Sequence, residues 1–169
     1  MIARLSRPFS IRRLHRPEEV SIEASEEERA ALAQALDIVA VKSLTATFTV
    51  RPWRGEGVAV SGTVCGEVVQ ECVVTLQPVD GRVEETVDMR LHPTVAEAST
   101  VDVDPEAGDP PELLDSDSVD LGAIAVEHFA LGLDPYPKAE GVTFEADVPE
   151  EDDAPPSPFA VLSTLRTSD

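Results

Sequence analysis

The sequence contains few aromatic residues and few cysteines. Aromatic side chains make up 4% of the 169 residues, so leucine, valine and alanine must supply most of a hydrophobic core. The two cysteines, Cys65 and Cys72, are too few for a disulfide framework. Their spacing places them on opposite faces of an unbroken strand, and we therefore expect no bond between them.

Basic residues are also scarce. The chain has 13 lysines and arginines against 33 acidic residues, which gives a net charge of −20. This charge argues against bulk electrostatic binding to nucleic acid or to an anionic membrane, and it favours either a basic partner or solubility alone. No apolar run approaches the roughly 20 residues of a membrane-spanning helix, and no secretory signal is recognisable. We expect a cytoplasmic protein with no membrane contact.

Sequence motifs of catalysis are missing. The chain has no phosphate-binding glycine loop, no His-Glu-x-x-His helix, no Gly-x-Ser-x-Gly elbow and no Cys-x-x-Cys pair. The histidines fall in three different predicted elements without a shared spacing. We therefore expect no enzyme, no metal and no cofactor. A nucleophilic Cys72, with a histidine brought close in space, remains the enzymatic alternative.

A long alternating segment, Gly57–Val79, is the clearest structural signal. Apolar residues or glycine occupy its even positions up to residue 76, except at Gln70, and this period of two is typical of a half-buried strand. The segment is roughly three times as long as a usual strand. We therefore expect it to bend or break near Gly62 or Gly66 and to end at Pro78.

Shorter alternating segments predict further strands. One covers residues 44–50 and forms a hairpin with the long segment through a turn at 52–57. After Pro78, the Asp80-Gly81 pair predicts a turn that leads into another strand over 83–91. A last short strand is predicted at 142–144. Hairpin connections of this kind indicate an antiparallel sheet.

Two helices complete the predicted domain. Ser25 and Glu28 have the spacing of a capping box, which predicts a helix over 26–37. Asp120 is expected to cap a second helix from Leu121 to Leu131, which ends before Gly132. We expect an α+β fold: a bent antiparallel sheet with two main helices, a long acidic loop and a short C-terminal helix. Residues 1–148 would form the single domain.

The acidic loop is predicted over residues 93–118, where acids and prolines replace any periodic pattern. We expect this loop to be mobile. Its spacing lacks the glycine and the final glutamate of an EF-hand loop, so calcium is not expected. The acids that we single out for binding a partner are Asp102, Asp104, Asp115 and Asp117.

The C-terminal region is predicted to carry a docking helix. Residues 149–156 form an acidic, proline-containing linker, and residues 157–169 form a short amphipathic helix and tail. Its apolar stripe consists of Phe159, Leu162 and Leu165. Isolated helices of this length are marginal in water, so we expect this one to order only against its own domain or against a partner.

The first sixteen residues contain five arginines and no acid. An organelle transit peptide is one explanation, although Pro8 interrupts the amphipathic helix that it would require. A basic arm that contacts RNA phosphates is another. We favour a short edge strand near residues 9–11 whose arginines pair with carboxylates of this protein. The arginines concerned are Arg7, Arg12, Arg13 and Arg16.

Four groups of residues, in chain order, carry a resemblance. They are Ser6-Arg7-Pro8-Phe9 with Ile11; Cys72-Val73-Val74-Thr75-Leu76-Gln77-Pro78; Val119-Asp120-Leu121-Gly122 with Glu127, Leu131 and Leu133-Asp134-Pro135; and Pro158-Phe159-Ala160-Val161-Leu162 with Leu165. Together they resemble the YceD family, the large ribosomal RNA subunit accumulation proteins of bacteria and plastids. The resemblance implies a non-catalytic role in the accumulation of large-subunit (23S) ribosomal RNA, and hence in ribosome assembly.

One departure from that family concerns its cysteines. Many similar sequences carry Cys-x-x-Cys at the end of the long strand, and some add cysteines after the second helix. Here Thr75 holds the second position, and residues 131–141 contain no cysteine. A four-ligand zinc site cannot be built in this way. We expect Cys72 to be a small buried hydrophobic residue.

The charge distribution indicates the kind of partner. Between Glu97 and Asp153 lie 18 acids and one base, Lys138. Such a surface repels RNA and attracts arginine- and lysine-rich proteins over about a Debye length, ~8 Å at physiological salt. We predict binding to a basic ribosomal protein or a large-subunit precursor particle, with any RNA contact indirect. The alternatives are direct RNA binding through the N-terminal arginines, or catalysis at Cys72.

Overall fold

The computed structural model describes residues 5–93, 111–114 and 116–143, which form seven strands and two helices. The elements in chain order are β1 (Pro8–Ser10), β2 (Glu18–Glu23), α1 (Glu26–Ala35), β3 (Ala40–Trp53), β4 (Gly57–Glu71), β5 (Pro78–His92), β6 (Glu112–Leu113), β7 (Ser118–Asp120) and α2 (Leu121–Leu131). The predicted α+β class is confirmed.

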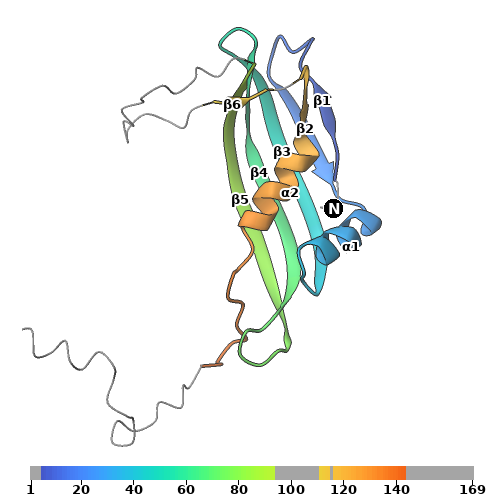
Figure 1. The fold of residues 1–169 in the computed structure, drawn as a ribbon, viewed down its shortest axis with the longest axis vertical. Coiled ribbons are helices and arrows are strands. Elements are labelled where there is room, and N and C mark those ends of the chain that lie inside the picture. Colours follow the sequence, from blue (N-terminus) through green and yellow to red (C-terminus); the bar gives the residue numbers. More distant parts are fainter. Residues whose placement is uncertain (1–4, 94–110, 115, 144–169) are drawn as a thin grey trace, which may run out of the picture.

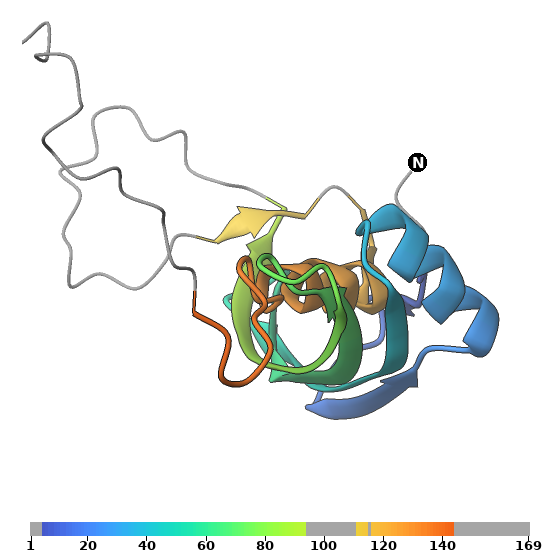
Figure 2. The same ribbon diagram turned by 90° about the horizontal axis from the view of Figure 1, so that it is seen from below.

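The main sheet has the strand order β2-β3-β4-β5-β6 (Figure 1). Strands β2 to β5 are antiparallel neighbours, whereas the two-residue β6 pairs with β5 in parallel. The sheet is therefore mixed, not purely antiparallel as predicted. A separate pair, β1 with β7, joins the N-terminal segment to the start of α2. Seen end-on, the long strands curl around α2 without closing into a barrel (Figure 2).

The alternating pattern of β4 places its even-numbered side chains in the core. Val58, Val60 and Val64 are fully buried, and Phe129 of α2 belongs to the same cluster. Gln70 is the polar exception on this face, and its side-chain amide donates to the carbonyl oxygen of Asp134 over 2.9 Å. That bond removes the cost of burying an unpaired amide.

The predicted break in the long strand does not occur. β4 pairs with β5 in one continuous register, and the irregularity lies in β3, between Val41 and Ser43. A Cβ atom added to Gly66 would lie 2.5 Å from both Phe129 Cε2 and the carbonyl oxygen of Ser43. Gly66 therefore allows the helix to approach the sheet closely and does not end the strand.

The predicted turn at Asp80-Gly81 is also wrong. β4 ends at Glu71, and the connection to β5 occupies residues 72–77, where Leu76 takes a left-handed φ of 59°. Asp80 and Gly81 lie inside β5, paired with residues 69 and 68. Pro78 begins β5, because a proline at the first position of a strand removes no required donor. The Asp80 carboxylate is held by Lys42 at 2.6 Å.

Other boundaries differ in smaller ways. Strand β2 was not predicted, because glutamates at positions 18, 19 and 23 of this edge strand hide its alternation. Helix α1 has the predicted capping box but ends at Ala35, two residues early. Helix α2 has the predicted bounds and the predicted cap, Asp120. Residues 142–143 are irregular where a strand was expected, and residue 144 lies outside the described residues.

Much of the predicted acidic loop and the C-terminal region lies outside the described residues, which exclude 94–110, 115 and 144–169. The described end of the loop differs from the prediction, since it contains β6 and the first residue of β7. The linker at 149–156 and the helix at 157–169 remain predictions. No helix in the described part of the chain is long and apolar enough to span a membrane.

The close approach at Gly66 gives a testable stability change. Gly66→Ala places a methyl group against Phe129 and a β3 carbonyl that cannot move aside. We expect a loss of about 1–3 kcal/mol in the free energy of unfolding, measured by urea titration. Gly81→Ala is the control, because its Cβ would meet only side-chain atoms at 3.1 Å or more, and its loss should be smaller. Equal losses for the two variants would contradict this account of Gly66.

Candidate functional site

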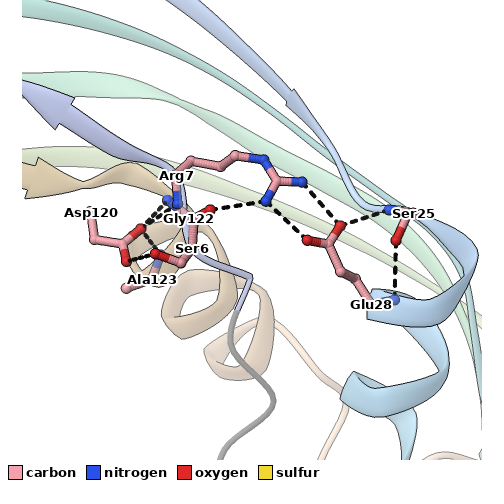
Figure 3. Close-up of polar contacts among 7 residues, drawn as sticks. All are labelled: Ser6, Arg7, Ser25, Glu28, Asp120, Gly122 and Ala123. Carbon is pink, nitrogen blue, oxygen red and sulfur yellow. Dashed lines mark hydrogen bonds and ion pairs between the residues drawn. The ribbon is translucent and has the colours of Figure 1, made fainter.

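Arg7, the first arginine singled out from the sequence, is engaged in an internal ion pair (Figure 3). Its two terminal nitrogens donate to the two carboxylate oxygens of Glu28 at 2.9 and 3.0 Å. The same carboxylate accepts from the amide of Ser25 at 2.9 Å and completes the cap of α1. These hydrogen bonds hold the pKa of Glu28 below its usual value, and the hydrogen bond from Arg7 has the largest effect.

Asp120 ties the N-terminal segment to α2 (Figure 3). One carboxylate oxygen accepts from the backbone amides of Arg7, Gly122 and Ala123 at 2.7, 3.0 and 3.2 Å. The other accepts from the Ser6 hydroxyl at 2.7 Å. Partial burial raises the pKa of Asp120, but these hydrogen bonds outweigh it, and the pKa lies below its ordinary value.

Arg12 is paired with Asp117, which was predicted to bind a partner. The Arg12 Nε donates to the Asp117 carboxylate at 2.7 Å, and both side chains are exposed. Arg13 and Arg16 are exposed and form no ion pair within the described residues. The prediction that N-terminal arginines pair with this protein's own carboxylates is confirmed for Arg7 and Arg12.

The structure does not bring the predicted site residues together. Arg7 lies between the two helices, whereas Arg12 and Asp117 meet at the edge of the β1–β7 pair. The other predicted site residues lie outside the described residues, and their role remains a prediction. They are Asp102, Asp104, Asp115, Phe159, Leu162 and Leu165.

Cys72 is buried, as predicted, but it lies in the turn that follows β4 and not in the strand, and it is more than an apolar side chain. Its sulfur accepts hydrogen bonds from the backbone amides of Thr75 and Ala139, both at 3.4 Å. The amide of Val73 donates to the Pro137 carbonyl at 2.9 Å, so the turn packs against the segment that follows α2.

The surroundings of Cys72 favour its thiolate form. Hydrogen bonds lower the pKa of Cys72 to about 6. The hydrogen bond with the Thr75 side chain has the largest effect, followed by those with the backbone of Ala139, Thr75 and Val74, whereas burial raises the pKa. None of these partners is a histidine that could serve as a base. Cys65, half-buried, is also a free thiol, so the predicted lack of a disulfide is confirmed. Within the described residues, no group of three or more potential ligands could hold a metal ion.

A cationic hollow at the β3–β4 hairpin was missed in the sequence. It has a volume of about 460 Å³ and is lined by Arg51, Pro52, Trp53, Arg54 and Arg90. The strand register brings Arg51 and Arg90 to the same row on either side of Ala59, although they are far apart in the chain. The residues 52–57 had been interpreted only as a turn, and Arg90 only as the polar side of a strand. Their shared surface depends on a register that the sequence alone does not fix.

The Asp120 contacts predict an acid-sensitive contribution to stability. Asp120→Asn keeps an acceptor oxygen but loses the charge that faces four donors, and we expect it to lower the free energy of unfolding by about 1 kcal/mol near neutral pH. Because the folded-state pKa is the lower one, this contribution is lost as the pH falls below about 4. Urea titrations of both proteins should therefore converge in acid. Glu127→Gln, an exposed change on the same helix, should follow the wild-type protein throughout; a gap between Asp120→Asn and wild type that is constant with pH would contradict the assignment.

The Cys72 contacts predict a thiol that ionises in weak acid. The thiolate absorbs in the ultraviolet, and the difference in absorbance between wild type and Cys72→Ser should rise through a midpoint near pH 6. Thr75→Val removes the largest of the contributing hydrogen bonds and should move that midpoint upward. Cys65→Ser is the control and should leave the midpoint in place. A midpoint at the ordinary thiol value of about 8.5 would contradict the hydrogen-bonded geometry.

Comparison with known proteins gives one family. Residues 60–166 match the family described as large ribosomal RNA subunit accumulation protein YceD. Neither the curated proteins nor the solved structures gave a match. The matched segment runs from β4 through α2 to the C-terminal region, and it includes Cys72, Asp120 and the predicted apolar stripe. It covers more than half of the sequence, and the chain belongs to the YceD family.

Proposed function

We propose that this protein is a non-catalytic ribosome biogenesis factor that supports accumulation of large-subunit (23S) ribosomal RNA by holding a basic partner. The observation that carries the proposal is the excess of acids in the segment that matches the family, with 18 acids and one base between Glu97 and Asp153. The family description gives the process, a role in accumulation of large-subunit ribosomal RNA. The negative charge of this segment indicates a basic partner.

The partner class follows from electrostatics. A surface of this sign repels the phosphate backbone of RNA and steers arginine- and lysine-rich proteins toward it. Ribosomal proteins of the large subunit, free or on a precursor particle, fit that description. We propose Asp102, Asp104 and Asp115 as the centre of the binding surface, with Asp117 at its margin because Arg12 already pairs with it. The apolar stripe Phe159, Leu162 and Leu165 would dock beside it.

A catalytic role receives little support from the geometry around Cys72. The sulfur is buried, and its hydrogen-bond partners are backbone amides and a threonine, which would stabilise a thiolate without presenting it to a substrate. Catalysis by a cysteine needs an accessible thiolate with a nearby acid or base. We therefore propose that the hydrogen bonds that lower the pKa of Cys72 serve to hold the turn in its folded conformation. We place the protein in the cytoplasm, where ribosomes are assembled.

The N-terminal RNA-binding alternative is weakened by the ion pairs already described. Arg7 is bound by both oxygens of Glu28, and Arg12 is bound by Asp117. An RNA phosphate would have to displace a bidentate carboxylate from Arg7, which costs the two charge-assisted hydrogen bonds between Arg7 and Glu28. Only Arg13 and Arg16 remain exposed and outside any ion pair of the described residues.

The proposal predicts that the acidic segment is needed for association with large-subunit precursors. Changing Asp102, Asp104 and Asp115 to asparagine should release the protein from the precursor fractions of a lysate sedimented at low salt, because the attraction for basic surfaces falls. The matched control changes Glu18, Glu19 and Glu23 to glutamine, which alters the net charge equally but at β2, an edge strand of the described sheet. This control should still co-sediment. Wild-type protein that stays at the top of the gradient at low salt would refute the proposal.

A further inference from the structure

The cationic hollow stands out because the rest of the molecule is so acidic. Three arginines and the only tryptophan of the chain line this hollow, which has a volume of about 460 Å³. The hollow belongs to the end of the sheet formed by the β3–β4 hairpin and the end of β5. It lies opposite the Cys72 turn, which joins the other ends of β4 and β5. Asp117, the one described residue of the proposed acidic binding surface, does not line it.

The arginines of the hollow are weakly neutralised. Arg51 has no carboxylate within 4 Å among the described residues. Arg90 lies 3.8 Å from Asp88, a separation too long for a hydrogen bond. Their side chains flank Ala59, which is fully buried although it faces outward between them. Arg51 is exposed and Arg90 is partly exposed, so both can reach a ligand at the surface.

The tryptophan gives the hollow a flat aromatic surface. The guanidinium carbon of Arg54 lies 4.8 Å from the centre of the Trp53 ring, and the His92 ring stands nearly perpendicular to it at 6.1 Å. These contacts hold the indole at the rim of the hairpin, where it remains partly exposed. Arg54 covers one face of the indole, so a planar base would stack on the opposite face or replace Arg54, and the neighbouring guanidinium groups would bind the adjoining phosphates.

We propose that the hollow formed by Arg51, Trp53, Arg54 and Arg90 binds single-stranded RNA, with a base stacked on Trp53 and the adjoining phosphates bound by Arg51 and Arg90. Guanidinium groups bind phosphate oxygens through paired hydrogen bonds, which a lysine cannot reproduce. Stacking requires an unpaired base, so the ligand is a single strand and not a duplex.

This inference goes beyond the proposed function, because it concerns another surface and another kind of partner. An acidic face repels RNA in bulk, and a small cationic hollow would then admit one short, correctly placed strand where a broadly basic surface would bind any nucleic acid. The two surfaces could act together on a precursor particle that contains both RNA and protein. Either can fail without the other, since purified RNA tests the hollow alone.

The test uses the full-length protein and single-stranded oligoribonucleotides of about ten nucleotides, a length that suits one small binding surface. Trp53 is the sole tryptophan, so quenching of its fluorescence reports stacking at this site directly. We expect quenching by oligoadenylate at low salt, with a dissociation constant that rises with salt at a logarithmic slope of about 1.4, the value for two phosphates on a single strand, one each for Arg51 and Arg90. Labelled RNA measures the variants by anisotropy.

Three variants separate the site from general charge effects. Arg51→Ala should weaken binding and reduce the salt slope by about 0.7, the share of one phosphate. Trp53→Leu should weaken binding about tenfold, as expected for one lost stacking contact. Arg82→Ala is the matched control, because Arg82 is also an exposed β5 arginine on the outward face, pairs with Glu84 and lies eight positions from Arg90. It should bind RNA like the wild-type protein, and circular dichroism confirms folding of each variant.

Several results would overturn the proposal. Absence of both quenching and anisotropy change at low salt would do so. Equal losses in Arg51→Ala and Arg82→Ala would reduce the effect to net charge. Binding of a labelled oligoglutamate peptide as tight as that of RNA, with no quenching by RNA, would identify the hollow as a site for acidic protein segments. Equal affinity for duplex and single-stranded RNA would exclude stacking on Trp53.

Discussion

The seating of α2 inside the curled sheet is the constraint on which the rest of the fold depends. The chain is poor in aromatic residues, and Phe129 is one of the few large side chains available to fill the space enclosed by the long strands. Its ring reaches the sheet only because Gly66 has no side chain there. This contact limits how deeply the helix sits, and Gly132 at the C-terminal end of α2 allows a second close approach, to Val83 and Glu85 of β5. The long strands curl around the helix (Figure 2).

The polar contacts around Asp120 and Arg7 extend this arrangement to the N-terminus. Asp120 begins α2 and binds the backbone of the N-terminal segment, while Arg7 crosses to the capping glutamate of α1. The two helices are thus joined through the N-terminal segment, which precedes both of them in the sequence. The arginines described in the structure therefore fall into two groups. Arg7 and Arg12 pair with carboxylates of the fold, whereas Arg51 and Arg54 at the β3–β4 hairpin are exposed to solvent.

The sequence predicted what depends on local chemistry. The capping residues Ser25 and Asp120 marked both helix starts, and alternation located β3, β4 and β5, because burial of one face imposes a period of two. The sequence-based predictions were wrong where pairing between strands, and not local composition, determines the conformation. Asp80-Gly81 has the composition of a turn, yet its bonds to β4 keep it extended. The hollow was missed for the same reason, since Arg51 and Arg90 become neighbours only through the register across Ala59.

The exposed edge strand β2 has a consequence of its own. An unpaired strand edge invites another copy of the chain to add a strand, and this edge belongs to a sheet with three long neighbours. Its glutamates at positions 18, 19 and 23 place like charges where two such edges would meet. The same residues that obscured this strand in the sequence thus disfavour the pairing of two β2 edges with each other.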